Sequence, residues 1–257
     1  MSDGTTTSAS IRFDALTRNE LVAAAPTTTL VIPVGSTEQH GHHLPTRVDA
    51  AIIEAVCLRA ADLAVEQVPV LVAPTLPYGC SHHHLPFGGT MSLTTTTYVE
   101  LVCDLVAGLA EQGFRSIVLM NGHGGNDAAL RVAVDRLTNE LRCGAHVAAT
   151  SYFQISAPGQ SPGHAGHFET SIMLALTPEL VHLDRRPNDP EPVTPLGRTD
   201  VPGGKIGRPG LWERSDGRTD DAREASVEIG AQLLDEISTA VADFLVAFHR
   251  SSFDRPH

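Results

Sequence analysis

The sequence predicts an α/β fold, specifically a three-layer α/β/α sandwich with a mainly parallel sheet. The first observation is that short apolar runs rich in β-branched residues alternate along the chain with longer segments of helical periodicity. Such alternation is typical of strand–helix–strand units, in which the strands lie parallel and helices cover both faces. The second observation is that loops rich in glycine and histidine follow strand candidates. Sites in parallel sheets form at the carboxyl ends of the strands.

The first strand–helix unit spans residues 28–64. Residues 28–34 form a short β-branched run that ends at Gly35, which is typical of a buried parallel strand. We expect Asp49 to act as the N-cap of a helix over residues 50–64, because this segment is rich in helix-forming residues.

The second unit repeats this pattern. Residues 68–73 predict another strand, and a loop rich in glycine and histidine follows over residues 78–90. Residues 95–113 have the apolar spacing of an amphipathic helix, with Gly113 as its stop. A third strand is predicted over residues 116–120.

The rest of the chain adds one strand and three helices. A turn over residues 121–126 leads into a helix over residues 127–141, and residues 146–152 predict a further strand. A short helix is expected over residues 170–176. A final amphipathic helix over residues 221–249 returns the chain to the fold.

We expect a single domain over residues 11–257. Residues 1–10 are a polar leader that we expect to be disordered, since they lack the basic start and the apolar stretch of a signal peptide. Residues 184–220 are polar and rich in proline and glycine. This segment is interpreted as an excursion from the domain, because no second core follows it.

The composition excludes several classes of protein. Hydrophobic residues make up 42% of the 257 residues and charged residues 19%, as in ordinary soluble proteins. No apolar run approaches the ~20 residues that span a bilayer. The net charge of −12 argues against a nucleic-acid partner. The four cysteines are scattered and show no CxxC spacing, which indicates reduced thiols and a cytoplasmic location.

Acidic and imidazole side chains occur in the loops and helix starts that the fold class brings together. Two histidines and three carboxylates form a ligand set of nitrogen and oxygen without sulfur, which suits zinc, manganese or iron. Five ligands exceed what one tetrahedral ion needs alongside water, so the sequence predicts a hydrolytic centre of two metal ions. The candidate ligands are Glu38, His40, Asp49, His123 and Glu169.

Each of these motifs also has a simpler interpretation. For Glu38 and His40 the simpler interpretation is a polar, solvated loop, since most charged residues are exposed. The glycine-rich turn over residues 121–126 resembles a phosphate loop, but it lacks the Gly-Lys-Ser/Thr ending and the Gly-x-Gly-x-x-Gly spacing. Glu169 lies in the first turn of a predicted helix, where a carboxylate is favoured by the helix dipole alone.

Other histidines are candidates for catalysis. His164 precedes a flexible Ala-Gly pair and is a candidate proton shuttle. The run of three histidines over residues 82–84 cannot aim every ring at one ion from an extended segment, so at most His84 or His82 is expected to face the site, with His84 preferred. His42 and His43 are not counted as ligands.

Three further residues are candidates for binding substrate. Gly124 and Gly125 flank or follow His123, and glycines leave space for ions or substrate near the main chain. Trp212 is the only tryptophan and lies in the polar excursion. It either lines the pocket or a subunit contact, where aromatic residues are enriched, or anchors the loop to the core.

The order and spacing of these motifs resemble the creatininase (creatinine amidohydrolase) family. The likeness runs from about residue 30 to residue 176 and rests on four blocks: Glu38-Gln-His-Gly41, Asp49, Asn121-Gly-His-Gly-Gly-Asn126, and His164-Ala-Gly-His-Phe-Glu-Thr-Ser171. The resemblance implies a three-layer α/β fold, two zinc, manganese or iron ions per subunit, and a homo-oligomer, often a hexamer. It assigns the five candidate ligands named above to the metals, with Asp49 as the bridge. It implies that His164 is the catalytic acid/base, and His84 matches a histidine found in many members.

The sequence departs from creatininase proper at two positions. Gly125 stands where creatininase has a metal-binding glutamate, and Gln160 stands where it has a tryptophan. Both changes argue against creatinine as substrate and favour the Gly-Gly branches of the family, which include deformylases, the mycofactocin-precursor peptidase and inosose-type hydrolases.

The resemblance therefore implies a metal-dependent hydrolase that cleaves an amide, cyclic amide or formamide C–N bond in a small polar substrate. The alternatives are a peptidase that trims a short peptide and a hydrolase of sugar derivatives or lactones. A non-catalytic metal-binding protein that keeps the fold is the alternative outside the enzymes.

Overall fold

The computed structural model describes residues 10–156, 162–188, 210 and 212–253. Apart from Ser10, the expected leader lies outside the described residues, as does most of the expected excursion over residues 184–220. The elements below belong to the described part of the chain.

A four-stranded parallel sheet forms the centre of the fold, with strand order β2-β1-β3-β4. The two middle strands pair over six residues, from Thr29 opposite Ser116 to Val34 opposite Asn121, and every residue of both is buried. Such complete burial explains why these strands are continuous apolar runs without alternation. The four strands are β1 (Thr29–Val34), β2 (Val70–Val72), β3 (Ser116–Asn121) and β4 (His146–Ser151).

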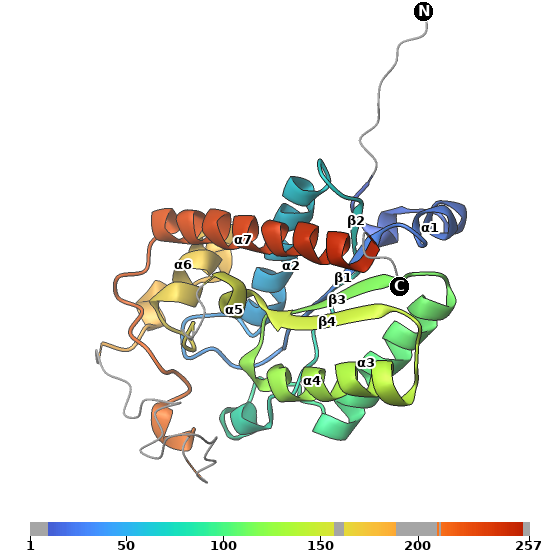
Figure 1. The fold of residues 1–257 in the computed structure, drawn as a ribbon. Helices are drawn as coiled ribbons and strands as arrows, with labels where there is room; N and C mark the ends of the chain where they lie inside the picture. The colour runs from blue at the N-terminus through green and yellow to red at the C-terminus, as the bar shows by residue number, and fades with distance from the viewer. Residues whose placement is uncertain (1–9, 157–161, 189–209, 211, 254–257) are drawn as a thin grey trace, which may run out of the picture.

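Helices cover both faces of this sheet (Figure 1). One face carries α2 (Val48–Ala64), α5 (Tyr152–Ser156), α6 (His167–Leu176) and α7 (Val227–Phe253). The other face carries α3 (Thr95–Glu111) and α4 (Asp127–Asp135). The short helix α1 (Arg18–Ala24) begins with a capping box between Thr17 and Glu20.

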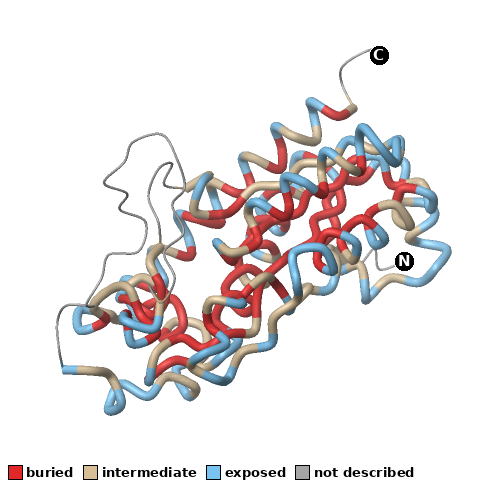
Figure 2. Tube along the Cα trace, turned by 90° about the horizontal axis from the view of Figure 1, so that it is seen from below, coloured by how far each residue is buried: buried red, intermediate tan, exposed pale blue. Residues whose placement is uncertain are grey.

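Alternate residues of the strands face the two helical layers. Val31 of β1 packs in the core cluster with α2, α6 and α7, whereas Leu30 and Ile32 pack in the cluster with α3 and α4. The buried strands accordingly run through the middle of the molecule, between helices whose outer sides are exposed (Figure 2). The predicted three-layer α/β/α sandwich is confirmed.

Short 3₁₀ and π-helical turns connect these elements. The 3₁₀ turns are η1 (Phe13–Ala15), η2 (His82–Phe87), η3 (Gly124–Asn126), η5 (Pro178–Leu180), η6 (Leu183–Arg185) and η7 (Glu213–Ser215). A π-helical turn, η4 (Arg136–Glu140), continues α4. Within the described residues, we find no helix with both the length and the apolar character needed to cross a membrane.

The strand order creates a place where connections diverge. The chain leaves β1 towards β2 at one edge, and it leaves β3 towards β4 at the other edge. The loops that follow β1 and β3 therefore separate above two adjacent strand ends, which is where open α/β sheets form binding crevices. The candidate residues Glu38, His40 and His123 lie in these two loops.

The structure corrects several predicted boundaries. Helix α2 begins at Val48, with Arg47 as its N-cap residue. Asp49 is therefore inside the first turn, and the prediction that its side chain caps the helix is wrong. Helix α6 begins at His167, earlier than expected, and α7 begins at Val227, later than expected. Helix ends depend on local capping contacts that composition does not reveal.

Candidate active site

Asp49 lies between two imidazole rings. Its Oδ1 atom is 3.2 Å from Nε2 of His40, and its Oδ2 atom is 3.1 Å from Nδ1 of His123. All three side chains are buried. The first turn of α2 holds the carboxylate in this position, so each of its oxygens faces a different ring.

Both rings of this trio also lie close to a glutamate. His40, Asp49 and Glu169 have donor atoms within 4.8 Å of one another, and Nε2 of His40 is 3.7 Å from Oε2 of Glu169. On the other side of Asp49, Oε1 of Glu38 is 3.3 Å from Nδ1 of His123. The structure thus brings the five predicted ligands together, with Asp49 between His40 and His123.

The loop before α6 is shaped to hold Glu169. Ala165 has a positive φ of 54°, a conformation that non-glycine residues rarely adopt. This turn lets the backbone N–H of Ala165 donate a hydrogen bond of 2.7 Å to Oε2 of Glu169. Backbone strain of this kind persists where the surrounding structure enforces it, and it is common at functional sites.

The donor atoms fit a divalent metal. Among the described residues, Oε1 of Glu38, Nε2 of His40 and Oδ2 of Asp49 are buried without a hydrogen-bond partner. Buried polar atoms without partners are costly, and a metal ion would satisfy all three. Imidazole nitrogen with carboxylate oxygen is a donor set that zinc, manganese and iron accept.

The electrostatics show the same demand for positive charge. Burial opposes ionisation of Glu38, yet the attraction of the His123 and His84 rings outweighs it and holds the pKa of Glu38 well below its usual value. Burial likewise opposes protonation of His40, but Asp49 and Glu169 raise its pKa well above the usual value. Burial, only partly offset by His40, raises the pKa of Glu169.

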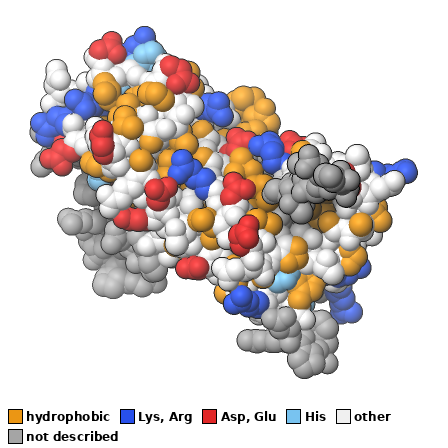
Figure 3. All heavy atoms as spheres, turned by 90° about the horizontal axis from the view of Figure 1, so that it is seen from above, with side chains coloured by type: hydrophobic (Ala, Val, Ile, Leu, Met, Phe, Trp, Pro, Cys, Tyr) orange, Lys and Arg blue, Asp and Glu red, His pale blue; other side chains and the backbone are white. Residues whose placement is uncertain are grey.

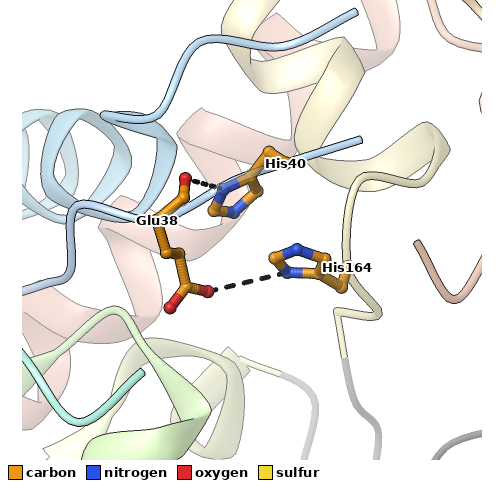
Figure 4. Close-up of side chains that lie close together, drawn as sticks. All are labelled: Glu38, His40 and His164. Atoms are coloured by element: carbon orange, nitrogen blue, oxygen red, sulfur yellow. Dashed lines mark hydrogen bonds and ion pairs between the residues drawn. The ribbon is translucent and has the colours of Figure 1, made fainter. Parts of the chain in front are cut away.

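His164 differs from these two rings. Its Nε2–H donates to the backbone carbonyl of Gln39 over 2.9 Å, which leaves Nδ1 without a proton. Nδ1 lies 3.8 Å from Oε1 of Glu38, and Figure 4 shows the two side chains pointing toward each other. Burial, together with repulsion from His40 and His84, holds the pKa of His164 well below its usual value. The ring is thus held in its neutral form, and its donor atom lies within 4.8 Å of those of Glu38 and His40, a third group that could hold a metal ion.

Gln39 is a site residue that the sequence analysis missed. Its side-chain amide nitrogen lies 2.7 Å from Nδ1 of His84, 3.1 Å from the Gly217 carbonyl and 3.1 Å from Nε2 of His164. When the amide donates to His84 Nδ1, His84 carries its proton on Nε2, which is 3.3 Å from Oε1 of Glu38. The position of Gln39 between two predicted ligands was the available signal.

The run of three histidines forms the 3₁₀ turn η2, not the extended segment expected from the sequence. Successive residues of such a turn point about 120° apart. His84 is buried against Glu38, His83 approaches His123 and Glu38, and His82 bonds Ser92 at the exposed side. We expected at most His84 or His82 to face the site. That expectation is wrong, because His83 also approaches it.

Trp212 packs on the rings of the site. Its ring centroid is 4.4 Å from that of His84, 4.8 Å from that of His83 and 5.5 Å from that of His164. These contacts place the indole beside the candidate site, and both interpretations of this tryptophan stay predictions.

The two glycines after His123 differ in their surroundings. A Cβ atom on Gly125 would overlap the carbonyl oxygen of Cys80 and Nε2 of His123, whereas a Cβ on Gly124 would meet no atom within 4 Å. Gly125 thus allows the main chain to pass close to His123, and Gly124 borders open space.

The remaining histidines near the site are oriented away from the donor groups. His43 is buried, with its Nε2 atom 2.9 Å from Oγ1 of Thr170. His42 is exposed, with its Nε2 atom 3.0 Å from Oδ2 of Asp216. Leaving both out of the ligand set agrees with this geometry.

A comparison with protein-family models identifies the family of the chain. The family model described as creatininase, creatinine amidohydrolase, matches residues 14–245. The chain belongs to the creatininase family. This confirms the family predicted from the sequence.

Individual members of the creatininase family are similar over much of the chain. A mycofactocin precursor peptide peptidase of Mycobacterium tuberculosis (strain ATCC 25618 / H37Rv) is 39% identical over 175 residues, which cover 66% of this chain and 66% of the peptidase. The aligned segment thus spans just under two thirds of the peptidase. Creatinine amidohydrolase of Pseudomonas putida is 35% identical over 257 residues, covering 87% of this chain and 91% of the relative.

Solved creatininase structures share the fold. A Zn-Zn form of a creatininase variant is 34% identical with a TM-score of 0.78, and the match covers 96% of this chain and 100% of that one. A manganese form of creatininase is 33% identical with a TM-score of 0.77, with the same coverage.

Proposed function

We propose that this protein hydrolyses an amide, cyclic amide or formamide C–N bond in a small polar substrate, at a centre of two divalent metal ions. The observation that carries the proposal is the position of Asp49, whose two carboxylate oxygens each face an imidazole of a separate donor group. A shared carboxylate between two groups is the usual bridge of a binuclear hydrolase.

The five predicted ligands would hold these ions. Glu38, Asp49 and His123 form one set, and His40, Asp49 and Glu169 form the other. When bound, the ions lower the pKa of a water molecule towards neutrality and polarise the scissile carbonyl group. Zinc, manganese and iron all suit these ligands.

His164 is proposed as the acid/base. Because Nε2–H is engaged by the Gln39 carbonyl, the lone pair on Nδ1 is directed towards Glu38. Nδ1 accepts the proton of the attacking water and later returns it to the departing nitrogen. A low pKa keeps this ring neutral at pH 7 and therefore ready to accept.

His84 and Trp212 are proposed to support this chemistry through their contacts with Glu38 and His164. The Nε2–H of His84 faces Oε1 of Glu38 and holds that carboxylate in its orientation. The indole of Trp212 covers His84 and His164, and we propose that it and Gly124 border the substrate. Water excluded by such a wall strengthens the electrostatic interactions within the site.

A peptidase is the second candidate function. The relatives named as peptidases are more similar over their aligned segment, at 39%, than creatinine amidohydrolase is over its longer alignment, at 35%. Gly125 also lacks the carboxylate of creatininase proper, which argues against creatinine. Cleavage near the end of a short peptide requires the same attack on an amide carbonyl.

A substrate panel tests the proposal and ranks the two candidates. Zinc- or manganese-loaded protein would be assayed on simple amides, lactams, formamides, lactones and short peptides, with metal content measured in parallel. Turnover of small amides or formamides supports the proposed function, and turnover of peptides alone supports the second. Metal bound without turnover on any member would indicate a non-catalytic binding protein.

The His164→Asn variant tests the assigned acid/base. Loss of proton transfer is expected to reduce kcat by about 10²- to 10⁴-fold, and metal content is measured in parallel because the donor atom of His164 lies close to those of Glu38 and His40. His167→Asn is the matched control, since His167 is exposed on the same segment. Wild-type turnover in His164→Asn would rule out the assigned role.

The remaining expectations concern the assembly and its location. A homo-oligomer, a hexamer by family resemblance, and a cytoplasmic location stay predictions. Light scattering on the purified protein measures the first directly.

A further inference from the structure

We propose that His83 is a further ligand of the metal ion held by Glu38 and His123. The inference rests on the proposed metal centre and adds a fourth protein ligand to one of its two sites. Its basis is the geometry of η2, which brings His83 close to Glu38 and His123.

The first observation is proximity. The donor atoms of Glu38, His83 and His123 all lie within 4.8 Å of one another. The rings of His83 and His123 are nearly parallel, at an angle of 5°, with centroids 6.0 Å apart.

The second observation is the number of ligands that the other residues around this ion supply. Glu38, Asp49 and His123 offer three donors. Gly125 has no side chain to offer, and a larger residue there would overlap Cys80 and His123. The main chain at Gly125 therefore has no space for a side chain that could serve as a ligand. His83 approaches His123 from η2 instead.

The third observation is the direction of the three adjacent histidines. His84 points to Glu38 and His82 to Ser92, so the 3₁₀ turn gives each ring a separate partner. His83 is partly exposed, and Trp212 packs against its ring at 4.8 Å between centroids. A partly exposed ligand beside the proposed wall of the pocket places this ion next to the substrate.

The additional imidazole has a consequence for the choice of metal. Imidazole suits zinc and iron, whereas carboxylate and water suit manganese. With two imidazoles, the ion held by Glu38 and His123 is expected to favour zinc or iron over manganese. The second site, with one imidazole and two carboxylates, is expected to discriminate less.

Zinc binding to the full chain tests the proposal. Metal-stripped protein is titrated with zinc against a competing chelator, and the emission of Trp212, the only tryptophan, reports the site beside it. Two zinc ions per chain are expected for the wild type. His83→Phe keeps a ring against Trp212 but offers no nitrogen, and one of the two affinities is expected to fall at least tenfold, since even outer partners of metal ligands are worth about 10- to 100-fold.

Two further variants separate coordination from packing. His83→Glu restores a donor without a ring and is expected to recover most of the lost affinity. His82→Phe is the matched control, and its zinc affinities are expected to equal those of the wild type. Circular dichroism and thermal melting check that each variant folds, and His83→Gln serves as the ring-free variant if His83→Phe does not.

The outcomes distinguish this inference from the proposed function. If the wild type binds two ions and His83→Phe binds both with unchanged affinity, His83 is not a ligand and the hydrolase proposal is unaffected. If His83→Phe loses affinity and His83→Glu does not recover it, the ring acts by packing and the inference is overturned. A wild type that binds no zinc would overturn the binuclear centre itself.

Discussion

Histidine takes different roles in this protein according to what surrounds each ring. His40 and His123 lie between carboxylates, which raise the pKa of both rings although burial opposes this. His164 lies beside other imidazoles, and its pKa is lowered by burial and by their repulsion. His42 pairs with Asp216 at the surface. Residue type alone does not separate these roles, whereas neighbouring charge and burial do.

His43 makes stability depend on pH. Burial, with added repulsion from Arg186, lowers the pKa of His43 to about 4, whereas an unfolded histidine titrates near ~6.5. Below the unfolded value the unfolded chain binds a proton that the folded chain does not. The free energy of unfolding therefore falls as pH falls from the unfolded pKa towards the folded one.

The His43→Gln variant measures this contribution. The glutamine amide keeps a polar partner for Thr170 but does not titrate. Between about pH 7.5 and 5.0, denaturant unfolding of the wild type is expected to lose about 2 kcal/mol more than unfolding of the variant. The same metal conditions apply to both proteins. An equal pH dependence of wild type and variant would show that His43 is not the responsible group.

At the scale of elements, the strands and the loops that follow them were predictable, whereas the directions of side chains were not. Continuous apolar runs identified β1 and β3, and glycine-rich loops identified the strand ends. The sequence did not reveal that residues 82–87 form a 3₁₀ turn, since a short histidine run has no periodicity to interpret. The approach of His83 to the site follows from that turn.

The contact between α6 and α7 fixes the position of Glu169 and yields a prediction about Gly230. A Cβ atom at Gly230 would overlap the backbone carbonyl of Ser171, so the two helices touch where α7 has no side chain. Gly230→Ala is expected to reduce the free energy of unfolding by about 1–3 kcal/mol, as overpacking does. It is also expected to weaken metal binding, because α6 carries Glu169.

Gly108 provides the matched control within a helix. A Cβ atom there would meet no atom within 4 Å, so Gly108→Ala is expected to raise stability by about 0.5–1 kcal/mol through the helix preference of alanine. Denaturant unfolding of both variants measures the difference. If Gly230→Ala is as stable as Gly108→Ala, the close helix contact is not a determinant of stability.

At the scale of the molecule, the site joins parts of the chain that are far apart in sequence. The loops after β1 and β3, the first turn of α2 and the first turn of α6 all contribute predicted ligands. The face of the molecule in Figure 3 carries acidic and basic side chains interspersed with hydrophobic ones. That face lacks the single basic field that nucleic-acid binding needs.

Metal removal is therefore expected to destabilise the whole fold. Ions that bind only the folded chain stabilise it by about 2.7 kcal/mol at a hundredfold excess over Kd, which corresponds to about 5–10 °C in Tm for a chain of this size. Differential scanning fluorimetry with zinc and with a chelator measures the shift. His123→Ala is expected to show a smaller shift, and an equal Tm with and without metal would contradict a structural link between these segments.

The sequence by itself determined the fold class, the five candidate ligands and the candidate acid/base His164. These follow from hydrophobic periodicity, from residue chemistry and from motif order, all of which can be obtained from the sequence alone. The tertiary structure decided that Asp49 faces two imidazoles, that Gln39 orients His84 and that His83 and Trp212 border the site. Such relations depend on where side-chain atoms lie in space, and that is set by packing between elements distant in sequence.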